Sequence, residues 1–486
     1  QLVVIAAGAP AFANGDTWKC LTCGISEGLA AAWGAGLERP QAFADGKRLL
    51  AGDTVFDCLP YYLDDERCTP ATLKAYRVQW DGADDASSPD VRPRGLRLHP
   101  DGAHVGFNVA HEGAGVVPQS AYIGRLRFDA DTGRYLIEGA VRLRKPGIAN
   151  RTVKPVSGRN RVEINARAID IMELSGFSAD GREAIYIGFP WESGNLDMFA
   201  VGLESGRVRR LTRDPGYSAA VDASPDGRWL ALADTRGTDR MLYLSGLRGA
   251  PPLVDAIAAP VLLALGQGSA RGALNLVLLD AQGDRAGYAG QIVSGGDPGW
   301  SVAAVPQWSP DSTAIVYAQT LDGAPSAEPG GRRSRLLLAR FPARAAAPPV
   351  TVVAVPDTIG WATPHAPGEA APRLDRLPEG TYALAGNSSN VRMTVAKGGE
   401  AVSVLYKDYA VDGGGMLNGT EGVSTSQPEA GVVRLRWNAN AAQAGAVPAR
   451  RLTGSDGLTV TVDTRAGTTA AAGSMVTTVD GRTYAA

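Results

Sequence analysis

The stretch Asp222-Ala223-Ser224-Pro225-Asp226-Gly227-Arg228-Trp229-Leu230-Ala231 decides the fold of this chain. Its centre is the pattern of a tight hairpin: proline opens the turn with a helical φ, aspartate bonds back to the backbone, and glycine adopts a positive φ that a β-carbon would oppose. Apolar or alternating residues on both sides are typical of β-strands. The same pattern recurs at residues 41–50, 97–107, 176–186 and 307–317. It predicts a chain built from repeated antiparallel hairpins.

The spacing of these five hairpins predicts a β-propeller. Their aspartates stand at positions 45, 101, 180, 226 and 311, and one four-stranded blade needs about 40 to 45 residues. Three of the four intervals fit one blade each, with a long loop around residues 145–169. The last interval has room for two blades, so we place a blade with a decayed turn at residues 260–265 and 274–279. The sequence therefore predicts six blades within residues 14–357.

The hairpins, together with Arg210-Leu211-Thr212 before Asp214-Pro215-Gly216, resemble the TolB-type propeller repeat, a relative of the WD repeats. The resemblance covers residues 15–356. Two features depart from it: His99 stands where serine is usual, and one of the six expected hairpins lacks the turn pattern. The resemblance implies a fold but no single function, because the family includes periplasmic scaffolds, peptidase gating domains and carbohydrate-active enzymes.

The C-terminal part has the pattern of a second β-domain. Proline-rich stretches at residues 343–349 and 364–378 mark a boundary, and we assign residues 358–378 to a linker. Short alternating strands follow at residues 380–384, 391–395, 402–406, 432–437 and 458–462. Residues 379–486 are therefore predicted to form a smaller β-sandwich-like domain, with an open barrel as the alternative.

The N-terminal region carries the signals for the compartment. Residues 1–13 are apolar and end in an Ala-x-Ala pattern, which fits either a signal-peptide remnant or a first strand. The four cysteines predict two disulfides, and we favour the local pairs Cys20 with Cys23 and Cys58 with Cys68. A four-thiolate zinc site and a redox-active Cys20–Cys23 pair are the alternatives. The expected location is secreted or extracytoplasmic.

Composition and motifs argue against several classes of protein. The 486 residues carry 48 basic and 50 acidic side chains, a formal charge of −2, so there is no global field to hold nucleic acid. No run of 18 apolar residues could form a transmembrane segment. Serine-hydrolase, phosphate-loop and zinc-protease motifs are missing, and four histidines are few for a metal site. We therefore expect no cofactor and no metal.

Candidate site residues gather on loops at the face opposite the hairpins, where propellers usually bind ligands. These loops carry carboxylates, arginines and tryptophans, a mixture that suits sugars: indole rings cover apolar C–H groups, and charged groups bond hydroxyls. The predicted catalytic residues are His111, Glu112, Glu192, Asp214 and Asp239. The predicted ligand-binding residues are Trp191, Arg213, Tyr217, Arg236 and Trp300.

These residues lead to one preferred function and two alternatives. We expect a secreted carbohydrate-active propeller, either a glycoside hydrolase or a polysaccharide lyase, which acts with a carboxylate pair. His111 could add a general base or a metal ligand. The alternatives are a non-catalytic scaffold that binds a protein or cell-surface partner, and a redox protein that uses Cys20 and Cys23. The expected partner is a carbohydrate or another extracellular ligand.

Overall fold

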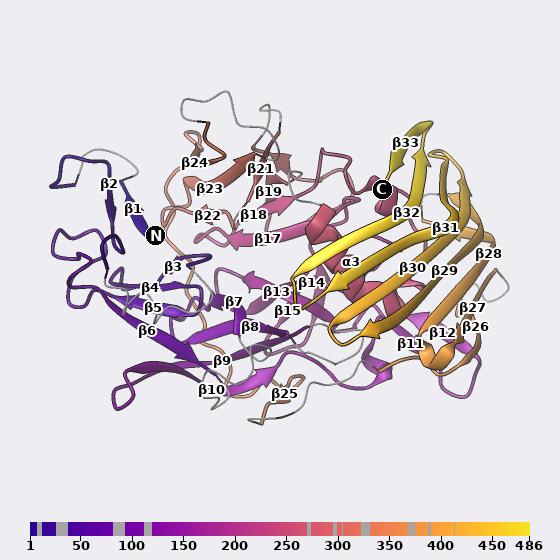
Figure 1. Ribbon diagram of the computed structural model, residues 1–486, viewed down its shortest axis with the longest axis horizontal. Coiled ribbons are helices and arrows are strands. Elements are labelled where there is room, and N and C mark those ends of the chain that lie inside the picture. Colours follow the sequence, from indigo (N-terminus) through magenta and orange to yellow (C-terminus); the bar gives the residue numbers. More distant parts are fainter. Residues whose placement is uncertain are drawn as a thin grey trace.

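The computed structural model of the chain describes residues 1–6, 12–25, 37–80, 93–110, 119–269, 274–294, 299–303, 305–321, 331–366, 369, 375–386, 390–412 and 414–486. These residues form mainly β-strands, which confirms the predicted all-β class. A group of small sheets lies beside one broad sheet of long strands that contains most of the C-terminal part (Figure 1).

Five sheets of four strands each form the first body. Neighbouring strands within a sheet are antiparallel, and a parallel contact between β6 and β10 joins the first two sheets. In chain order the sheets contain β3 (Gln41–Ala42), β4 (Arg48–Ala51), β5 (Thr54–Asp57) and β6 (Lys74–Gln79); β7 (Pro93–Leu98), β8 (His104–Ala110), β9 (Gln119–Asp129) and β10 (Arg134–Arg142); β13 (Ile171–Phe177), β14 (Glu183–Gly188), β15 (Met198–Gly202) and β16 (Val208–Arg210); β17 (Ser218–Ala223), β18 (Trp229–Asp234), β19 (Asn275–Asp280) and β20 (Gln291–Ile292); and β21 (Trp300–Val302), β22 (Gln307–Trp308), β23 (Ala314–Leu321) and β24 (Ser334–Arg340).

The five sheets surround a common axis, as propeller blades do. Residues from or next to the first strand of every sheet line one shared cavity, among them Arg97, Phe177, Asp222 and Gln307. The side-chain amide of Gln307 donates a hydrogen bond to the carbonyl of Pro40, so the fifth sheet meets the first and the ring is closed. The predicted propeller is confirmed.

Each repeated sequence pattern forms the predicted turn. In the first four blades it joins the first and second strands, and in the fifth it joins β22 to β23, which pairs with both β21 and β22. The glycines of the first four turns have φ between 65° and 75°. In the same turns the aspartate side chain accepts a hydrogen bond from the backbone N–H two residues later. In the fifth turn Ser312 takes the positive φ, and its hydroxyl accepts a hydrogen bond from the backbone N–H of Asp226 in the neighbouring turn.

The described residues form five blades, and the prediction of a sixth is wrong. Residues 260–265, which we assigned to a decayed hairpin, lie in helix α3 (Asp255–Ser269), and residues 275–280 form β19 of the fourth blade. A short apolar run fits a buried helix as well as a buried strand. Helix α3 is apolar on several sides because it is enclosed between the propeller and the broad sheet. The fourth blade therefore carries a helical insertion, which also contains α2 (Leu242–Ser245).

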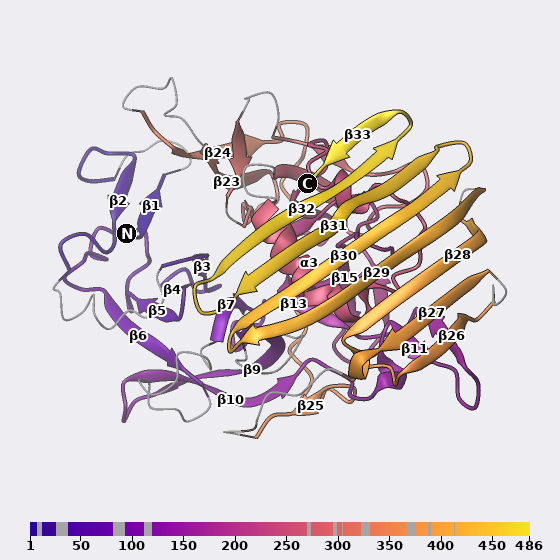
Figure 2. The same ribbon diagram turned by 45° about the vertical axis from the view of Figure 1, so that its right-hand side comes forward.

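The C-terminal strands form one continuous sheet, so the open alternative describes them better than the predicted sandwich. Strands β11 and β12, from the insertion that begins with the short helix η2 (Ile148–Asn150), extend one edge. Figure 2 shows the long strands crossing over α3, which occupies the place of a second sheet. The order across the sheet is β11 (Val153–Pro155), β12 (Arg161–Ile164), β26 (Gly380–Leu384), β27 (Val391–Ala396), β28 (Ala401–Val411), β29 (Gly415–Glu429), β30 (Val432–Ala444), β31 (Ala449–Asp463), β32 (Thr468–Val479) and β33 (Arg482–Ala485), with the short helix η3 (Lys397–Gly399) between β27 and β28.

A buried polar cluster joins the broad sheet to the propeller. The side chains of Arg451 on β31 and Glu421 on β29 are fully buried and lie 2.5 Å apart. Arg451 also donates to the carbonyl of Leu244 in α2, and Glu421 accepts from the hydroxyl of Ser193 in the third blade. At the start of α3, burial and the charge of Glu421 raise the pKa of Asp255 to about 8.

The first proline-rich stretch runs across the turns of the propeller. Residues 344–361, which we call the strap, pass the fifth, fourth, third and second turns in that order. Arg344 pairs with Asp226 at 2.9 Å. After the strap, β25 (Thr363–Pro364) pairs with β10, so part of the predicted linker belongs to the second blade. The strap's backbone N–H groups that donate to the turns are those of Ala347, Val350, Val353 and Val355.

The N-terminal region contains a small sheet and two disulfides. Strand β1 (Val3–Ile5) pairs with β2 (Trp18–Cys20). Disulfides Cys20–Cys23 and Cys58–Cys68 confirm the predicted local pairs, so the zinc-thiolate alternative is wrong. Because disulfides form in oxidising compartments, the protein is extracytoplasmic. Within the part of the chain that the structure describes, no helix has the length and apolar character needed to cross a membrane.

Candidate functional site

A pocket of about 250 Å³ lies beside the third blade, toward the face opposite the turns; we call it the rim pocket. It lies between β14, β15 and β16 on one side and the insertion that carries β11 and β12 on the other. Its apolar part is aromatic: the rings of Tyr186 and Phe199 stack with centroids 5.8 Å apart, and Phe189 and the half-buried Trp191 lie alongside. Tyr186, Phe199 and Phe189 are buried, so the partly exposed ring of Trp191 is the aromatic surface that a ligand ring can reach.

The polar wall of the rim pocket contains two arginines with different surroundings. Arg210 is held by Asp197 at 2.5 Å and by Glu192 at 3.2 Å. Arg213 is exposed, and its guanidinium forms no hydrogen bond or ion pair with the residues that the structure describes. Arg213 is therefore the cation available to a ligand.

The carboxylates behind this wall, Glu192 and Asp197, form ion pairs with arginines. Burial alone would raise the pKa of Glu192, but Arg248, 2.7 Å away, and Arg210 outweigh this effect and hold the pKa below its usual value. For Asp197 burial is the stronger effect and raises the pKa to about 6 despite the nearby Arg210. Glu192 is thus an ionised partner of two arginines, which does not suit the proton donor of an acid–base pair.

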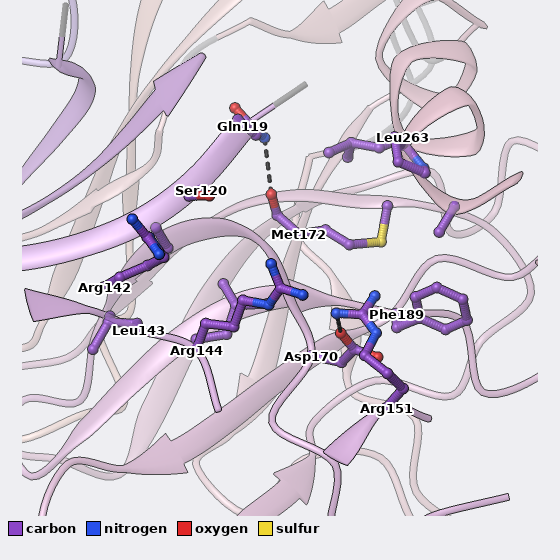
Figure 3. Close-up of a pocket in the computed structure, with 14 residues that line it drawn as sticks. Gln119, Ser120, Arg142, Leu143, Arg144, Arg151, Asp170, Met172, Phe189 and Leu263 are labelled. Atoms are coloured by element: carbon purple, nitrogen blue, oxygen red, sulfur yellow. Dashed lines mark hydrogen bonds and ion pairs between the residues drawn. The ribbon is translucent and has the colours of Figure 1, made fainter. Parts of the chain in front are cut away.

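A smaller cavity of about 40 Å³ adjoins the rim pocket and shares Asp170 with it. Arg142, Arg144 and Arg151 line it, and Figure 3 shows their side chains around the cavity. Burial and the neighbouring Arg151 lower the pKa of Arg144. Across both cavities, guanidinium groups outnumber carboxylates among the lining residues. Among the described residues, Arg142 lies within 4.0 Å of Glu369, Arg144 of Asp375, and Arg151 of Asp170.

Asp170, the residue before β13, positions the insertion against the third blade. Its carboxylate lies 2.5 Å from the guanidinium of Arg151. It also accepts hydrogen bonds from the backbone N–H and the hydroxyl of Thr152, at 3.0 and 3.2 Å. Both carboxylate oxygens are engaged in these contacts, so Asp170 shapes the site and is poorly placed to react with a ligand.

The structure brings two of the predicted ligand-binding residues, Trp191 and Arg213, together in the rim pocket. Glu192, predicted to be catalytic, lies behind the pocket wall in the ion pairs described above. Asp214 follows Arg213 in the chain and keeps a partly exposed side chain. Burial raises the pKa of Asp214 to about 6, although Arg236 opposes the shift.

Arg236 belongs to a buried ion-pair cluster and is not an exposed ligand contact. Its guanidinium lies 2.9 Å from Asp284, 3.6 Å from Asp214 and 3.8 Å from Asp234. The cluster links the fourth blade to the loop before β20. Among the described residues, no three metal-ligating side chains come close enough to hold a metal ion.

The remaining predicted residues that the structure describes do not line the rim pocket. Tyr217 is 3% exposed, because the unforeseen helix α3 passes over it at Gly266; the prediction of an accessible tyrosine is wrong. Asp239 is exposed on the loop before α2. Trp300 lies in the fifth blade beneath the guanidinium of Arg335, 4.1 Å from the ring centroid. His111 and Glu112 lie outside the described residues.

Sequence reasoning missed the residues that the insertion contributes. Arg142, Arg144, Arg151 and Asp170 line the smaller cavity, but we treated residues 145–169 only as a long loop. The available signal was the closely spaced arginines that flank the start of this loop. Tyr186, in the rim pocket, lies on a strand whose apolar pattern predicted only a blade core.

Comparison with known proteins gives only distant likenesses. No family model matches the chain, and no curated protein matches it. Its structure is similar to TolB from Acinetobacter baumannii, with 13% identity, a TM-score of 0.29, and coverage of 74% of this chain and 57% of that one. It is also similar to the periplasmic gluconolactonase PpgL from Pseudomonas aeruginosa (11% identity, TM-score 0.25, coverage 85% and 90%). A third likeness is to oligogalacturonate lyase from Vibrio parahaemolyticus (11%, 0.24, 72% and 84%). The propeller assignment rests on the sheet order and the shared axial cavity.

Proposed function

We propose that this protein binds an acidic carbohydrate in the rim pocket. The observation that carries the proposal is the presence, in one pocket, of the partly exposed ring of Trp191 and the guanidinium of Arg213, which pairs with none of the residues that the structure describes. A sugar ring can lie against Trp191 through its C–H groups, while a hexuronate carboxylate accepts hydrogen bonds from Arg213. A neutral sugar would use the ring surface but leave this cation without a partner.

The size of the rim pocket limits what it can enclose. Sites for drug-sized ligands usually measure about 300 to 1,000 Å³, and the rim pocket measures about 250 Å³. It therefore suits one sugar unit or a chain end, with the rest of the saccharide outside. The arginines of the adjoining cavity are each paired with a carboxylate, so Arg213 is the cation that would favour an acidic chain, although the whole protein carries a formal charge of −2.

Turnover of the bound saccharide, by hydrolysis or by elimination, is a second proposal, and Asp214 is the residue that favours it. A carboxyl group with a pKa of about 6 can give and take a proton near neutral pH. Asp214 follows Arg213 in the chain but does not line the rim pocket, so a saccharide bound at Arg213 would reach it only by extending out of the pocket. Glu192 would keep Arg210 and Arg248 in place and take no part in proton transfer.

Calorimetric titration with hexuronate oligosaccharides and with neutral oligosaccharides of the same linkage tests the binding proposal. We expect the acidic series to bind more tightly, and Arg213→Gln and Trp191→Ala each to weaken it about tenfold. Arg228→Gln and Trp18→Ala, which change exposed residues outside the rim pocket, are the matched controls. Equal affinity for both series, or variants that bind like the wild type, would contradict the proposal.

The same samples test turnover. New reducing ends would report hydrolysis, and unsaturated uronate products would report elimination. Asp214→Asn should abolish either product while leaving binding within a few-fold of the wild type. A protein that binds none of the saccharides would favour the alternative of a non-catalytic scaffold for a protein partner.

A further inference from the structure

A second cavity, independent of the rim pocket, lies on the propeller axis. It measures about 120 Å³ and is lined by residues from all five blades. Pro100 and Ala179, from the second and third turns, are part of the lining, so the cavity is at the end of the channel where the turns are. We call it the axial cavity. Its polar side chains are Arg39, Gln41, Arg97, Ser178, Asp222 and Gln307.

Arg97 brings a buried charge into the axial cavity. The residue is only 6% exposed, and its guanidinium donates to the carbonyls of Ser175 and Leu96, at 2.7 and 3.1 Å. No carboxylate among the described residues lies within ion-pair distance of it. Burial, reinforced by Arg39, lowers its pKa to about 9, so it still carries its charge at neutral pH. A buried cation that has no ion pair among the described residues is costly, and an anionic ligand would lower that cost.

Arg39 adds a second guanidinium to the same cavity. Its side chain is half-buried and forms no hydrogen bond or ion pair with the part of the chain that the structure describes. It passes so close to Gly95 that a β-carbon there would lie 2.8 Å from Nη1. The absence of a side chain at Gly95 therefore gives Arg39 the space to reach the first strand of the second blade, which carries Arg97.

Asp222 supplies an acceptor in the cavity. Its carboxylate accepts a hydrogen bond from the backbone N–H of Trp308 at 2.8 Å, which fixes its position on β17. Two cations and one carboxylate leave the cavity with a net positive charge. A ligand that matches this arrangement has one anionic group for the arginines and one hydrogen-bond donor for Asp222.

We propose that the axial cavity binds a small carboxylate that carries a hydroxyl or ammonium group, with its carboxylate held by Arg97 and Arg39. Planar guanidinium groups match a carboxylate in shape as well as charge. At about 30 Å³ per water molecule, the cavity has room for roughly four waters, and so for a ligand of only a few non-hydrogen atoms. A doubly charged phosphate fits less well, because Asp222 repels its second charge.

Titration with glycolate, acetate and inorganic phosphate at pH 7.5 tests the proposal. We expect glycolate to bind most tightly, because its hydroxyl can donate to Asp222. Arg39 is half-buried and has no hydrogen bond or ion pair to lose among the described residues, so Arg39→Gln should weaken glycolate binding at least tenfold without unfolding the protein, while the exposed control Arg228→Gln leaves binding unchanged. Asp222→Asn should strengthen acetate binding several-fold by removing a like charge.

Each outcome bears on the proposal. Glycolate should also raise the thermal midpoint of the wild type and not that of Arg39→Gln, since a ligand stabilises only the state that binds it. Failure of all three probes to bind, or equal binding to the Arg39 variant, would overturn the site. Tighter binding of phosphate than of glycolate would overturn the ligand class. None of these results depends on the rim pocket or its saccharide.

Discussion

Replacement of Gly181 by alanine should destabilise the protein through both the backbone and the packing of the third turn. Gly181 has a φ of +75°, which costs an alanine about 1 to 2 kcal/mol. A β-carbon there would also lie 2.5 Å from Cε1 of His99 and 2.9 Å from the carbonyl oxygen of Val353 in the strap. Overpacking of this kind adds about 1 to 3 kcal/mol. We expect a total loss of roughly 2 to 5 kcal/mol.

His99 cannot move aside to relieve the contact. Its ring is wholly buried, Nε2 donates to the carbonyl of Gly181 at 2.9 Å, and Nδ1 accepts from the backbone N–H of Asp101. The edge of the ring also meets Phe177, with centroids 4.9 Å apart. These contacts explain why histidine stands in the second turn in place of serine: it links that turn to the third.

Gly102→Ala is the matched control for this experiment. Gly102 occupies the same position of the second turn with a φ of +66°, but a β-carbon there would meet nothing within 4 Å. Gly102→Ala should therefore lower the free energy of unfolding only by the cost of the positive φ, about 1 to 2 kcal/mol. Urea unfolding followed by tryptophan fluorescence would measure both variants, and the effect of alanine on the unfolded chain cancels in the comparison. Equal destabilisation of the two variants would refute the packing role of His99 and the strap.

Two further predictions concern the contact between the broad sheet and the propeller. Arg451→Met should reduce the free energy of unfolding by about 3 to 5 kcal/mol, because it leaves Glu421 buried without its cation. The control Arg450→Met changes an exposed residue on the same strand and should alter the free energy of unfolding by no more than about 0.5 kcal/mol. Similar urea midpoints for the two variants would contradict this prediction. The pKa of Asp255 is about 8 in the folded state and about 4 in the unfolded state, so between these pH values only the folded state holds the proton. The free energy of unfolding should therefore fall by up to about 1.4 kcal/mol for each pH unit as the pH rises from about 4 to about 8. Asp255→Asn cannot ionise, so its stability relative to the wild type should increase with pH across this range, and a constant difference would disprove the shift.

The turns and disulfides were predictable because their geometry is decided by neighbouring residues. In the fourth turn, Asp226 bonds to the backbone N–H of Arg228, and Gly227 takes the positive φ next to it. The Cys58–Cys68 pair closes a short loop, so the nearest partner was also the right one. Such local arrangements leave a direct mark on the sequence.

The predicted number of blades was wrong because the apolar run at residues 260–265 fits a buried strand as well as a buried helix. Residues 260–265 are apolar enough for a buried strand, and Pro260 argues against the interior of a helix. The segment is nevertheless helical in the structure, because α3 fills the space between the fourth blade and the broad sheet, where residues 261–265 pack among apolar side chains. Neither neighbour of α3 can be recognised from the segment itself.

Only part of the candidate site was predictable, because the sequence shows which residues lie on loops but not which side chains they pack against. Trp191 and Arg213 follow strand ends on the expected face, and the structure brings them into one pocket. Arg236 lies on a similar loop but is buried by carboxylates from three different segments. Whether a charged loop residue faces a ligand or another side chain depends on partners far along the chain.

The sequence by itself therefore determined the repeated turns, the all-β class, the propeller and the cysteine pairs, since each depends on residues a few positions apart. Only the tertiary structure decided the number of blades, the single broad sheet closed by α3, and the cavities that the arginines face. Contacts such as that between Ser193 and Glu421 join segments more than two hundred residues apart. Burial and charge pairing at such separations depend on how whole sheets pack, and no short stretch of sequence records that packing.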